Sequence, residues 1–236
     1  MYRQPQEDTQ LIISGDEVFY SFQGEGDSIG CPAVFLRLHH CNLSCSWCDT
    51  RYTWDATLPE YHQERKVWSI IEVAEQIYQR QRANCHRLVI TGGEPLIQQK
   101  SLVKLIELLP DWIIEIETNG TIIPVSGLYR CQFNCSPKLS NSDVPFEKRF
   151  KKDALGVLGR LNTCFKFVIK RPEDIDELER DYGRWIDKEK IILSPESISA
   201  EDMQSVMQSI AEVAMQRGYR LLPRLQVLLW GNQRGR

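Results

Sequence analysis

Three cysteines stand close together in Cys41-Asn42-Leu43-Ser44-Cys45-Ser46-Trp47-Cys48, and their spacing is suited to metal chemistry. Thiolates bind zinc and iron-sulfur clusters above all, and neither use requires cysteines that lie far apart in the sequence. A cluster with four irons normally takes four cysteine ligands, whereas this segment supplies three. One iron would be left open, and an open iron can bind a cofactor or a substrate.

A structural zinc site is the alternative for these cysteines, with His39 or His40 as its fourth ligand. Structural zinc sites more often join two Cys-x-x-Cys hooks, and the sequence has no second hook, so we favour the cluster. Adjacent residues on a strand point to opposite faces, so we expect His39 and His40 not to act together. The other cysteines are expected to be inert small hydrophobes: Cys31, Cys85, Cys131, Cys135 and Cys164.

Further polar clusters each follow a predicted strand. They are Thr91-Gly92-Gly93-Glu94, Glu117-Thr118-Asn119-Gly120, Ser136-Pro137-Lys138 and Ser194-Pro195-Glu196-Ser197. Since α/β folds place their active sites at the ends of strands, we expect these clusters and the cysteines to share one functional edge. Another segment, Gln23-Gly24-Glu25-Gly26, indicates either a close approach of the backbone to a ligand or a simple turn.

The elements that must position these clusters alternate between strand and helix. Apolar strands are predicted to begin in 11–26, at 32–38, 86–90 and 112–116, and near 131–135, 165–169, 190–193 and 220–228. Helices are predicted from a capping box at Ser69, through Leu102 to Leu109, and over 172–182 and 200–217. The alternation predicts an α/β fold with a parallel sheet. A complete eight-unit barrel takes about 250 residues, so about six parallel strand-helix units in a single domain, residues 1–236, predict a partial, trimmed TIM-type barrel.

Composition narrows the functional classes. The chain has 236 residues, 42% hydrophobic and 26% charged, as expected of a globular protein. A net charge of −3 gives no general attraction to nucleic acid. No apolar run is long enough to cross a bilayer, and residues 1–8 lack the apolar core of a secretory signal. We therefore expect a cytoplasmic protein with reduced cysteines and no membrane or nucleic-acid partner.

Through these residues, the chain resembles the radical S-adenosylmethionine (SAM) superfamily. Its hallmarks are Cys-x-x-x-Cys-x-x-Cys after the first barrel strand and a Gly-Gly-Glu turn after the second. Within the superfamily the chain is similar to the 7-carboxy-7-deazaguanine synthases of queuosine and 7-deazapurine biosynthesis. The motifs that carry this resemblance are Phe22-Gln23-Gly24-Glu25-Gly26, Phe35-Leu36-Arg37, Cys48-Asp49-Thr50, Thr91-Gly92-Gly93-Glu94-Pro95, Glu117-Thr118-Asn119-Gly120, Ser136-Pro137-Lys138 and Leu229-Trp230-Gly231-Asn232.

The resemblance implies two cofactors. Cys41, Cys45 and Cys48 would hold a [4Fe-4S] cluster whose open iron chelates SAM, and an electron would release a 5′-deoxyadenosyl radical. Gly93 and Glu94 would position the methionine end of SAM. The rest of SAM would be lined by Ser136, Pro137, Lys138, Ser194, Pro195, Glu196 and Ser197.

The resemblance also implies a substrate and a reaction. The substrate, 6-carboxy-5,6,7,8-tetrahydropterin, would be converted to 7-carboxy-7-deazaguanine with loss of ammonia and regeneration of SAM, a lyase reaction. Arg37 would pair with the substrate carboxylate, and Thr50 would supply a hydroxyl to Mg²⁺. The substrate would be gripped by Phe22, Gln23, Gly24, Arg37 and Thr91. Expected partners are a reductant such as flavodoxin or ferredoxin and a second copy in a homodimer.

Two alternative functions remain for a chain with this cysteine motif. A glycyl-radical-enzyme activase would share the cysteine spacing but need no Mg²⁺, and a non-catalytic zinc-binding module would hold no cluster.

Some family members end in a Gln-Thr-His tail that reaches the substrate, whereas this chain has Pro223-Arg224-Leu225-Gln226-Val227-Leu228. Substrate contacts from the C-terminus are therefore not expected from the resemblance.

Overall fold

One curved sheet organises the computed structural model, which describes residues 9–231 and 233–235. Its nine strands follow the order β3-β1-β2-β4-β5-β6-β7-β8-β9. Neighbours from β2 to β9 are parallel, whereas β1 is antiparallel to both β2 and β3. The strands are β1 (Gln10–Phe22), β2 (Pro32–Leu38), β3 (Arg65–Ser69), β4 (Arg87–Gly92), β5 (Ile113–Thr118), β6 (Gln132–Cys135), β7 (Thr163–Ile169), β8 (Ile191–Pro195) and β9 (Arg220–Leu221).

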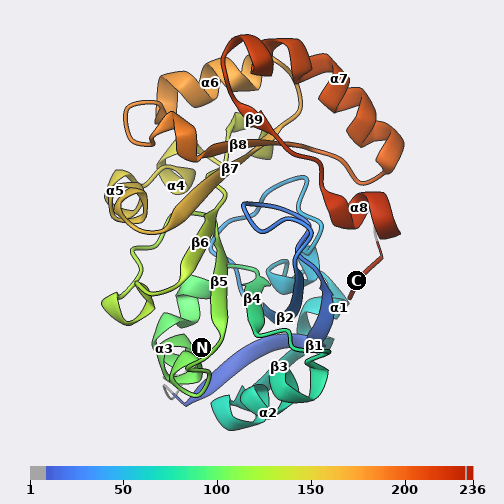
Figure 1. Cartoon of the computed structure of the whole chain (residues 1–236), viewed down its shortest axis with the longest axis vertical. Coiled ribbons are helices and arrows are strands. Elements are labelled where there is room, and N and C mark those ends of the chain that lie inside the picture. Colours follow the sequence, from blue (N-terminus) through green and yellow to red (C-terminus); the bar gives the residue numbers. More distant parts are fainter. Residues whose placement is uncertain (1–8, 232, 236) are drawn as a thin grey trace.

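Helices cover the outer face of this sheet, and the loops at the carboxyl ends of the strands turn inward (Figure 1). The helices are α1 (Pro59–Gln63), α2 (Ile70–Arg80), α3 (Gln99–Glu107), α4 (Phe146–Arg149), α5 (Lys152–Arg160), α6 (Glu173–Tyr182), α7 (Ala200–Gln216) and α8 (Leu225–Trp230). Six longer parallel strands, β2 and β4 to β8, confirm the predicted partial barrel of about six units. None of the helices in the described ranges has the length and apolar character needed to span a membrane. Residues 1–8, examined above for a signal, lie outside the described part.

Local sequence explains these elements. Leu88, Val89 and Ile90 are all fully buried, as expected for a parallel strand covered on both faces. The predicted capping box at the start of α2 is confirmed. Glu72 donates its backbone N–H to the Ser69 hydroxyl over 3.2 Å, and the Glu72 carboxylate accepts from the Ser69 N–H over 2.7 Å.

Three features differ from the predicted elements. The strand expected over 220–228 consists of the two residues of β9, because Pro223 follows and has no N–H to donate. Residues 225–230 form α8 instead. The first strand runs antiparallel to its neighbours, and β3 was not predicted, since its charged residues Arg65 and Lys66 disguise an edge strand.

Two ionisable groups of the apolar core predict how stability depends on pH. Burial raises the pKa of Cys131 from 9.0 to about 11 and the pKa of Tyr182 from 10.0 to about 12. Because the folded values lie above the unfolded ones, their stabilisation is complete below about pH 9 and is lost as the pH rises. We expect each of these two groups to lower the free energy of unfolding in urea by about 1 kcal/mol per pH unit above its unfolded pKa, over about pH 9 to 11 for Cys131. Cys131→Ala should reduce this slope, and a flat profile would contradict the prediction.

Candidate active site

A cavity of about 380 Å³ lies where the carboxyl ends of the parallel strands converge. Every predicted site residue lines it except Glu94 and Pro137. The predicted residues brought together there are Phe22, Gln23, Gly24, Arg37, Cys41, Cys45, Cys48, Thr50, Thr91, Gly93, Ser136, Lys138, Ser194, Pro195, Glu196 and Ser197. The strand-end clusters and the cysteines therefore lie together at one edge of the sheet, as expected.

The cysteine loop (residues 41–50) follows β2 directly. Cys45 is buried, and Cys41 and Cys48 pack half-buried around the same small apolar cluster with Leu43 and Val144. Backbone and ring N–H groups face two of the sulfurs: the Leu43 N–H donates to Cys41 over 3.5 Å, and the Trp54 indole donates to Cys48 over 3.3 Å. Hydrogen bonds to thiolate sulfur are among the features by which proteins tune iron-sulfur clusters, so these residues fit that group.

Two thiols of the loop, Cys41 and Cys45, resist ionisation. Burial, together with the nearby Glu94 and the other two thiols, raises the pKa of Cys41 to about 12, and burial also raises the pKa of Cys45. Metal ions displace such protons when they bind. Within the described ranges, no three His, Cys, Asp or Glu side chains are close enough to enclose a single metal ion. A cubane cluster binds each thiolate through a different iron and does not require that convergence.

The Gly-Gly-Glu turn after β4 supports the start of the cysteine loop. A Cβ on Gly92, whose φ is +127°, would lie 2.0 Å from the Leu38 carbonyl oxygen, and one on Gly93 would lie 2.0 Å from that of His40. Only glycine permits this contact. The Gly93 and Glu94 N–H groups donate to these same two carbonyls over 3.1 and 2.8 Å.

Glu94 points into the protein and not into the cavity. Its fully buried carboxylate accepts from the Leu96 N–H, the Thr118 hydroxyl and the Asn119 N–H over 3.0, 2.8 and 2.7 Å. Burial raises its pKa in spite of these bonds. Asn119 lines the cavity, so Glu94 acts on the site by fixing the β5 loop.

The residues expected to grip a pterin form another part of the cavity wall. Arg37 on β2 is paired in register with Thr91 on β4, and its Nε lies 2.5 Å from the Glu17 carboxylate. Gln23 is buried and donates to Glu115 and Glu117 on β5 over 3.3 and 3.1 Å. This wall is therefore held by polar contacts within the sheet.

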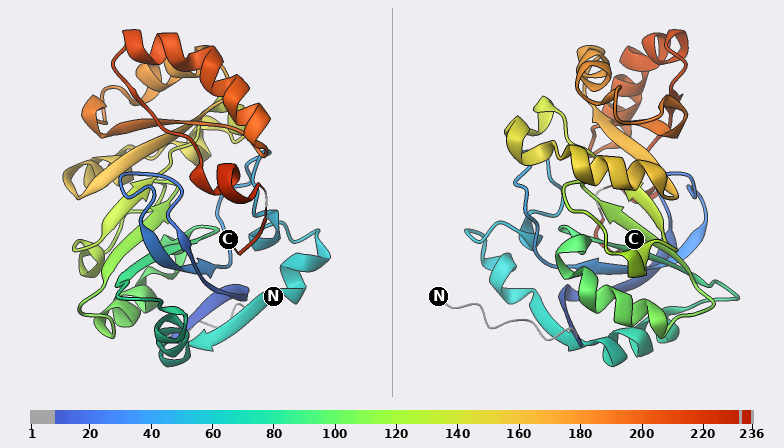
Figure 2. Two further views of the ribbon diagram at one scale, coloured as in Figure 1. Left: turned by 45° about the vertical axis from the view of Figure 1, so that its right-hand side comes forward. Right: turned by 90° about the vertical axis from the view of Figure 1, so that its left-hand side faces the viewer.

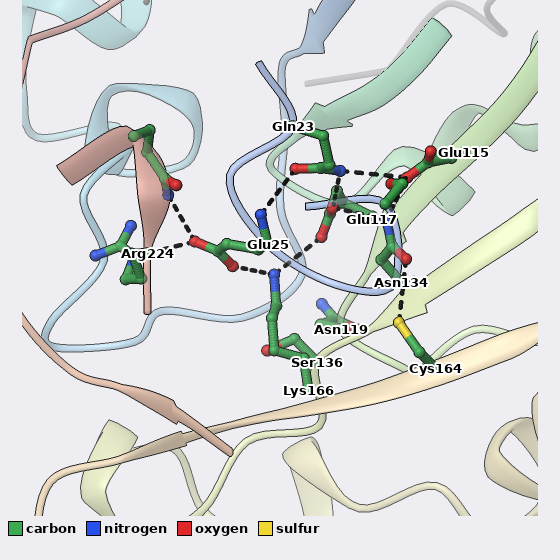
Figure 3. Close-up of polar contacts among 12 residues, drawn as sticks. Gln23, Glu25, Glu115, Glu117, Asn119, Asn134, Ser136, Cys164, Lys166 and Arg224 are labelled. Carbon is green, nitrogen blue, oxygen red and sulfur yellow. Dashed lines mark hydrogen bonds and ion pairs between the residues drawn. The ribbon is translucent and has the colours of Figure 1, made fainter. Parts of the chain in front are cut away.

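A buried charge network adjoins Gln23 through Glu117, and it was not predicted from the sequence. Figure 3 shows Lys166 of β7 between Glu25 and Glu117; it contacts the first closely and the second over 3.1 Å. Glu25 also accepts from Arg224 and from Gln226 over 3.0 and 2.7 Å. One signal pointed to it, since Lys166 and Glu117 are charges inside apolar strands, where a charged side chain is rarely buried without a partner.

The C-terminal segment forms part of the cavity wall, which the resemblance did not imply. Arg224, Gln226, Val227, Gly231, Gln233, Arg234 and Gly235 all line it. The Leu225 N–H donates to the Gly24 carbonyl over 3.0 Å, and Trp230 stacks on Phe22 with ring centroids 6.3 Å apart. Figure 2 shows α8 lying beside the loop that follows β1. Asn232, part of the tail motif, lies outside the described residues.

The two histidines differ from expectation. Their Nδ1 atoms lie 3.3 Å apart, and His40 also contacts the Tyr61 hydroxyl over 3.1 Å. The alternation rule failed because β2 ends at Leu38 and His40 has a φ of +78°. Both side chains pack around Tyr61 outside the cavity lining.

Comparisons with known proteins agree with this geometry. The Radical SAM superfamily profile matches residues 36–136. A 7-carboxy-7-deazaguanine synthase from Pyrobaculum aerophilum is 36% identical over 229 residues, 93% of this chain and 96% of the relative. One from Halobacterium salinarum is 31% identical over 92% of this chain and 90% of the relative. The crystal structure of QueE from Escherichia coli superposes with a TM-score of 0.71 at 26% identity, covering 94% of this chain and 100% of that one.

Proposed function

The chain belongs to the 7-carboxy-7-deazaguanine synthase family of the radical SAM superfamily, and we propose that it converts 6-carboxy-5,6,7,8-tetrahydropterin to 7-carboxy-7-deazaguanine with release of ammonia. The convergence of the cysteine loop, the Gly-Gly-Glu turn and the Arg37–Thr91 wall on one cavity carries this proposal. A [4Fe-4S] cluster and SAM are the cofactors of this superfamily, and when bound they supply an electron and a radical that removes a substrate hydrogen.

The protein's own residues hold and orient these groups. Cys41, Cys45 and Cys48 hold the cluster. The residues proposed to contact SAM are Gly93, Ser136, Lys138, Ser194, Pro195, Glu196 and Ser197. Lys138 is fixed for this role by donating to the Ser136 hydroxyl over 2.9 Å and by lying 5.3 Å from the centre of the Trp47 ring. Glu94 and Pro137 act from behind the cavity wall.

The substrate is proposed to lie between β1, β2 and β4. Phe22 and Gly24 offer a flat apolar surface and a backbone without a side chain, and Thr91 offers a hydroxyl. Gln23 is proposed to support the substrate from the wall, where it is bonded to Glu115 and Glu117. Arg37 is bound to Glu17 through Nε, and its two terminal nitrogens suit a carboxylate in a bidentate pair. The C-terminal segment keeps water from this region, which strengthens every polar contact within it.

A turnover assay with the carboxytetrahydropterin tests the proposed function. The purified protein, reconstituted with iron and sulfide without oxygen, is mixed with a reductant, SAM, Mg²⁺ and the carboxytetrahydropterin, and the product is identified by mass spectrometry. We expect 7-carboxy-7-deazaguanine and ammonia in equal amounts with SAM regenerated. No product from a protein whose cluster is intact and which binds SAM would refute the proposed function.

A Mg²⁺ ion is proposed at Thr50, whose side chain lines the cavity two residues beyond Cys48. Thr50→Ala removes a single oxygen ligand from an ion otherwise held by substrate and water. We expect turnover to fall about tenfold or more at limiting Mg²⁺ and to recover partly at high Mg²⁺. Thr57→Ala, at an exposed threonine outside the cavity lining, is the control. Unchanged turnover and metal response in Thr50→Ala would show that the ion lies elsewhere.

The remaining assignments are proposals of the same kind. The electron donor is a small reductant such as flavodoxin or ferredoxin, the enzyme acts as a homodimer in the cytoplasm, and residues 1–236 act as one domain. All eight cysteines are free thiols, as a reducing compartment favours. Light scattering in solution tests the dimer, and turnover with the purified donor tests the reductant.

A further inference from the structure

Arg224 stands out among the cavity residues because its guanidinium contacts three separate segments. Its Nε donates to Glu25 over 3.0 Å, and its Nη2 donates to Asp49 over 2.8 Å. Its Nη1 donates to the backbone carbonyl of Ser197 over 2.7 Å. Glu25 follows β1, Asp49 belongs to the cysteine loop, and Ser197 belongs to the loop after β8.

The setting of Arg224 holds it in this position. Its side chain is 19% exposed, and its backbone N–H donates to the Met203 sulfur of α7 over 3.2 Å. The next residue, Leu225, is bonded to the Gly24 carbonyl, so the chain on both sides of the guanidinium is fixed. A guanidinium offers five donors in a rigid plane, which is why one arginine can satisfy partners in three directions.

Each of the three partners adjoins a different part of the proposed machinery. Glu25 adjoins Gly24 on the substrate wall. Asp49 lies between Cys48 of the cluster loop and Thr50, and Ser197 ends the loop proposed to contact SAM. We propose that Arg224 is a positioning residue that fixes the spacing between the bound substrate, the cluster loop and SAM. This inference rests on the proposed function and deepens it.

Loss of the Arg224 contacts should weaken the coupling between radical formation and substrate conversion. Reactions that depend on placement lose rate steeply when reacting groups move by about 1 Å. Without Arg224 the three loops move independently, so the substrate is bound more weakly and a larger share of SAM is cleaved without product. The readouts are the KM for the pterin and the ratio of 5′-deoxyadenosine to 7-carboxy-7-deazaguanine.

Arg224→Gln and Arg224→Lys are compared with Arg220→Gln, which provides a matched control. Arg220 lies on the same C-terminal segment and pairs with Asp27 over 2.7 Å, but the two side chains are 48% and 47% exposed. Each reconstituted variant is assayed and then examined by amide hydrogen exchange over residues 23–26, 47–50 and 195–198. For Arg224→Gln we expect faster exchange in all three segments and a KM raised about tenfold or more, because its charged hydrogen bonds are lost. Arg224→Lys should recover part of both, and Arg220→Gln should match the wild type.

The outcomes separate this inference from the proposed function. If exchange in Arg224→Gln changes only within the C-terminal segment, or if KM and the deoxyadenosine ratio stay at wild-type values, Arg224 does not couple the loops and the inference fails. If the wild type makes no product, the proposed function fails. Hydrogen exchange then still decides whether Arg224 joins the three segments. A uniform rise in exchange across the whole chain would indicate general unfolding and would also reject a positioning role.

Discussion

Replacing Cys45 by serine is expected to abolish turnover completely, with product falling below detection. Cys45 is the most buried of the three loop cysteines, and Cys41 and Cys48 alone would leave a second iron without a protein ligand. After anaerobic reconstitution the variant should lack the visible charge-transfer absorption of a cluster and hold much less iron. Because a serine hydroxyl replaces a thiol in an apolar cluster, the free energy of unfolding of the cluster-free protein should fall by about 1–3 kcal/mol, which leaves the protein folded.

Cys31→Ser is the control, because Cys31 is a free, half-buried thiol that lies outside the cavity lining. This variant should hold as much iron as the wild type and retain turnover. A Cys45→Ser protein that binds a full cluster and forms product would show that the ligands have been misassigned. A wild-type protein that stays colourless and retains one zinc ion would instead favour the zinc-binding alternative.

Lys166→Met is expected to destabilise the protein by about 3 kcal/mol. The lysine is 9% exposed and stands between the Glu25 and Glu117 carboxylates, which are 16% and 19% exposed. Methionine has a similar length but no charge, so both carboxylates lose a cation while they remain largely desolvated. Urea unfolding of the cluster-free protein measures the change, and turnover should also fall because Glu25 adjoins the substrate wall.

The control for this prediction is an exposed ion pair. Lys66 and Asp16 lie 2.7 Å apart with side chains 41% and 70% exposed, so Lys66→Met should change stability by less than about 1 kcal/mol. Equal effects from the two lysine substitutions would show that the buried network contributes no more than a surface pair.

Acid should reduce the difference in the free energy of unfolding between Lys166→Met and the wild type. Burial alone would raise the pKa of Glu25, but Lys166 and Arg224 outweigh it and hold this pKa well below its ordinary value of 4.5. A lowered folded pKa stabilises the protein above the unfolded value and loses that contribution as the pH falls. The stability gap should therefore be largest at neutral pH and shrink below about pH 4.5. A gap that stays constant down to about pH 3 would mean that the Glu25 carboxylate is not the cause.

Most of the fold could be predicted because its signals are local. Apolar runs such as Leu88 to Ile90 and the capping box at Ser69 depend only on nearby residues. The failures came where a non-local contact decided the structure. The segment after β9 has the apolar character of a strand, but its partners Gly24 and Phe22 lie near the other end of the chain.

Some residues of the candidate site could likewise be predicted from local motifs, whereas others could not. Motifs that require a residue type at a fixed spacing, such as the three cysteines and Gly92-Gly93, were placed correctly at the cavity. Glu94 was not, because the sequence cannot tell which way a carboxylate points at the end of a turn. Only the folded chain shows that three backbone and side-chain donors draw it inward.

The sequence by itself determined the chemistry: a thiolate triad, a glycine turn that permits close backbone contact, and polar residues at strand ends. Tertiary structure alone decided how these parts are joined. The contacts of Lys166 with Glu25 and of Arg224 with Asp49 link residues 141 and 175 positions apart. No periodicity encodes such pairs, because a buried charge reveals only that it needs a partner and the topology of the sheet selects which one.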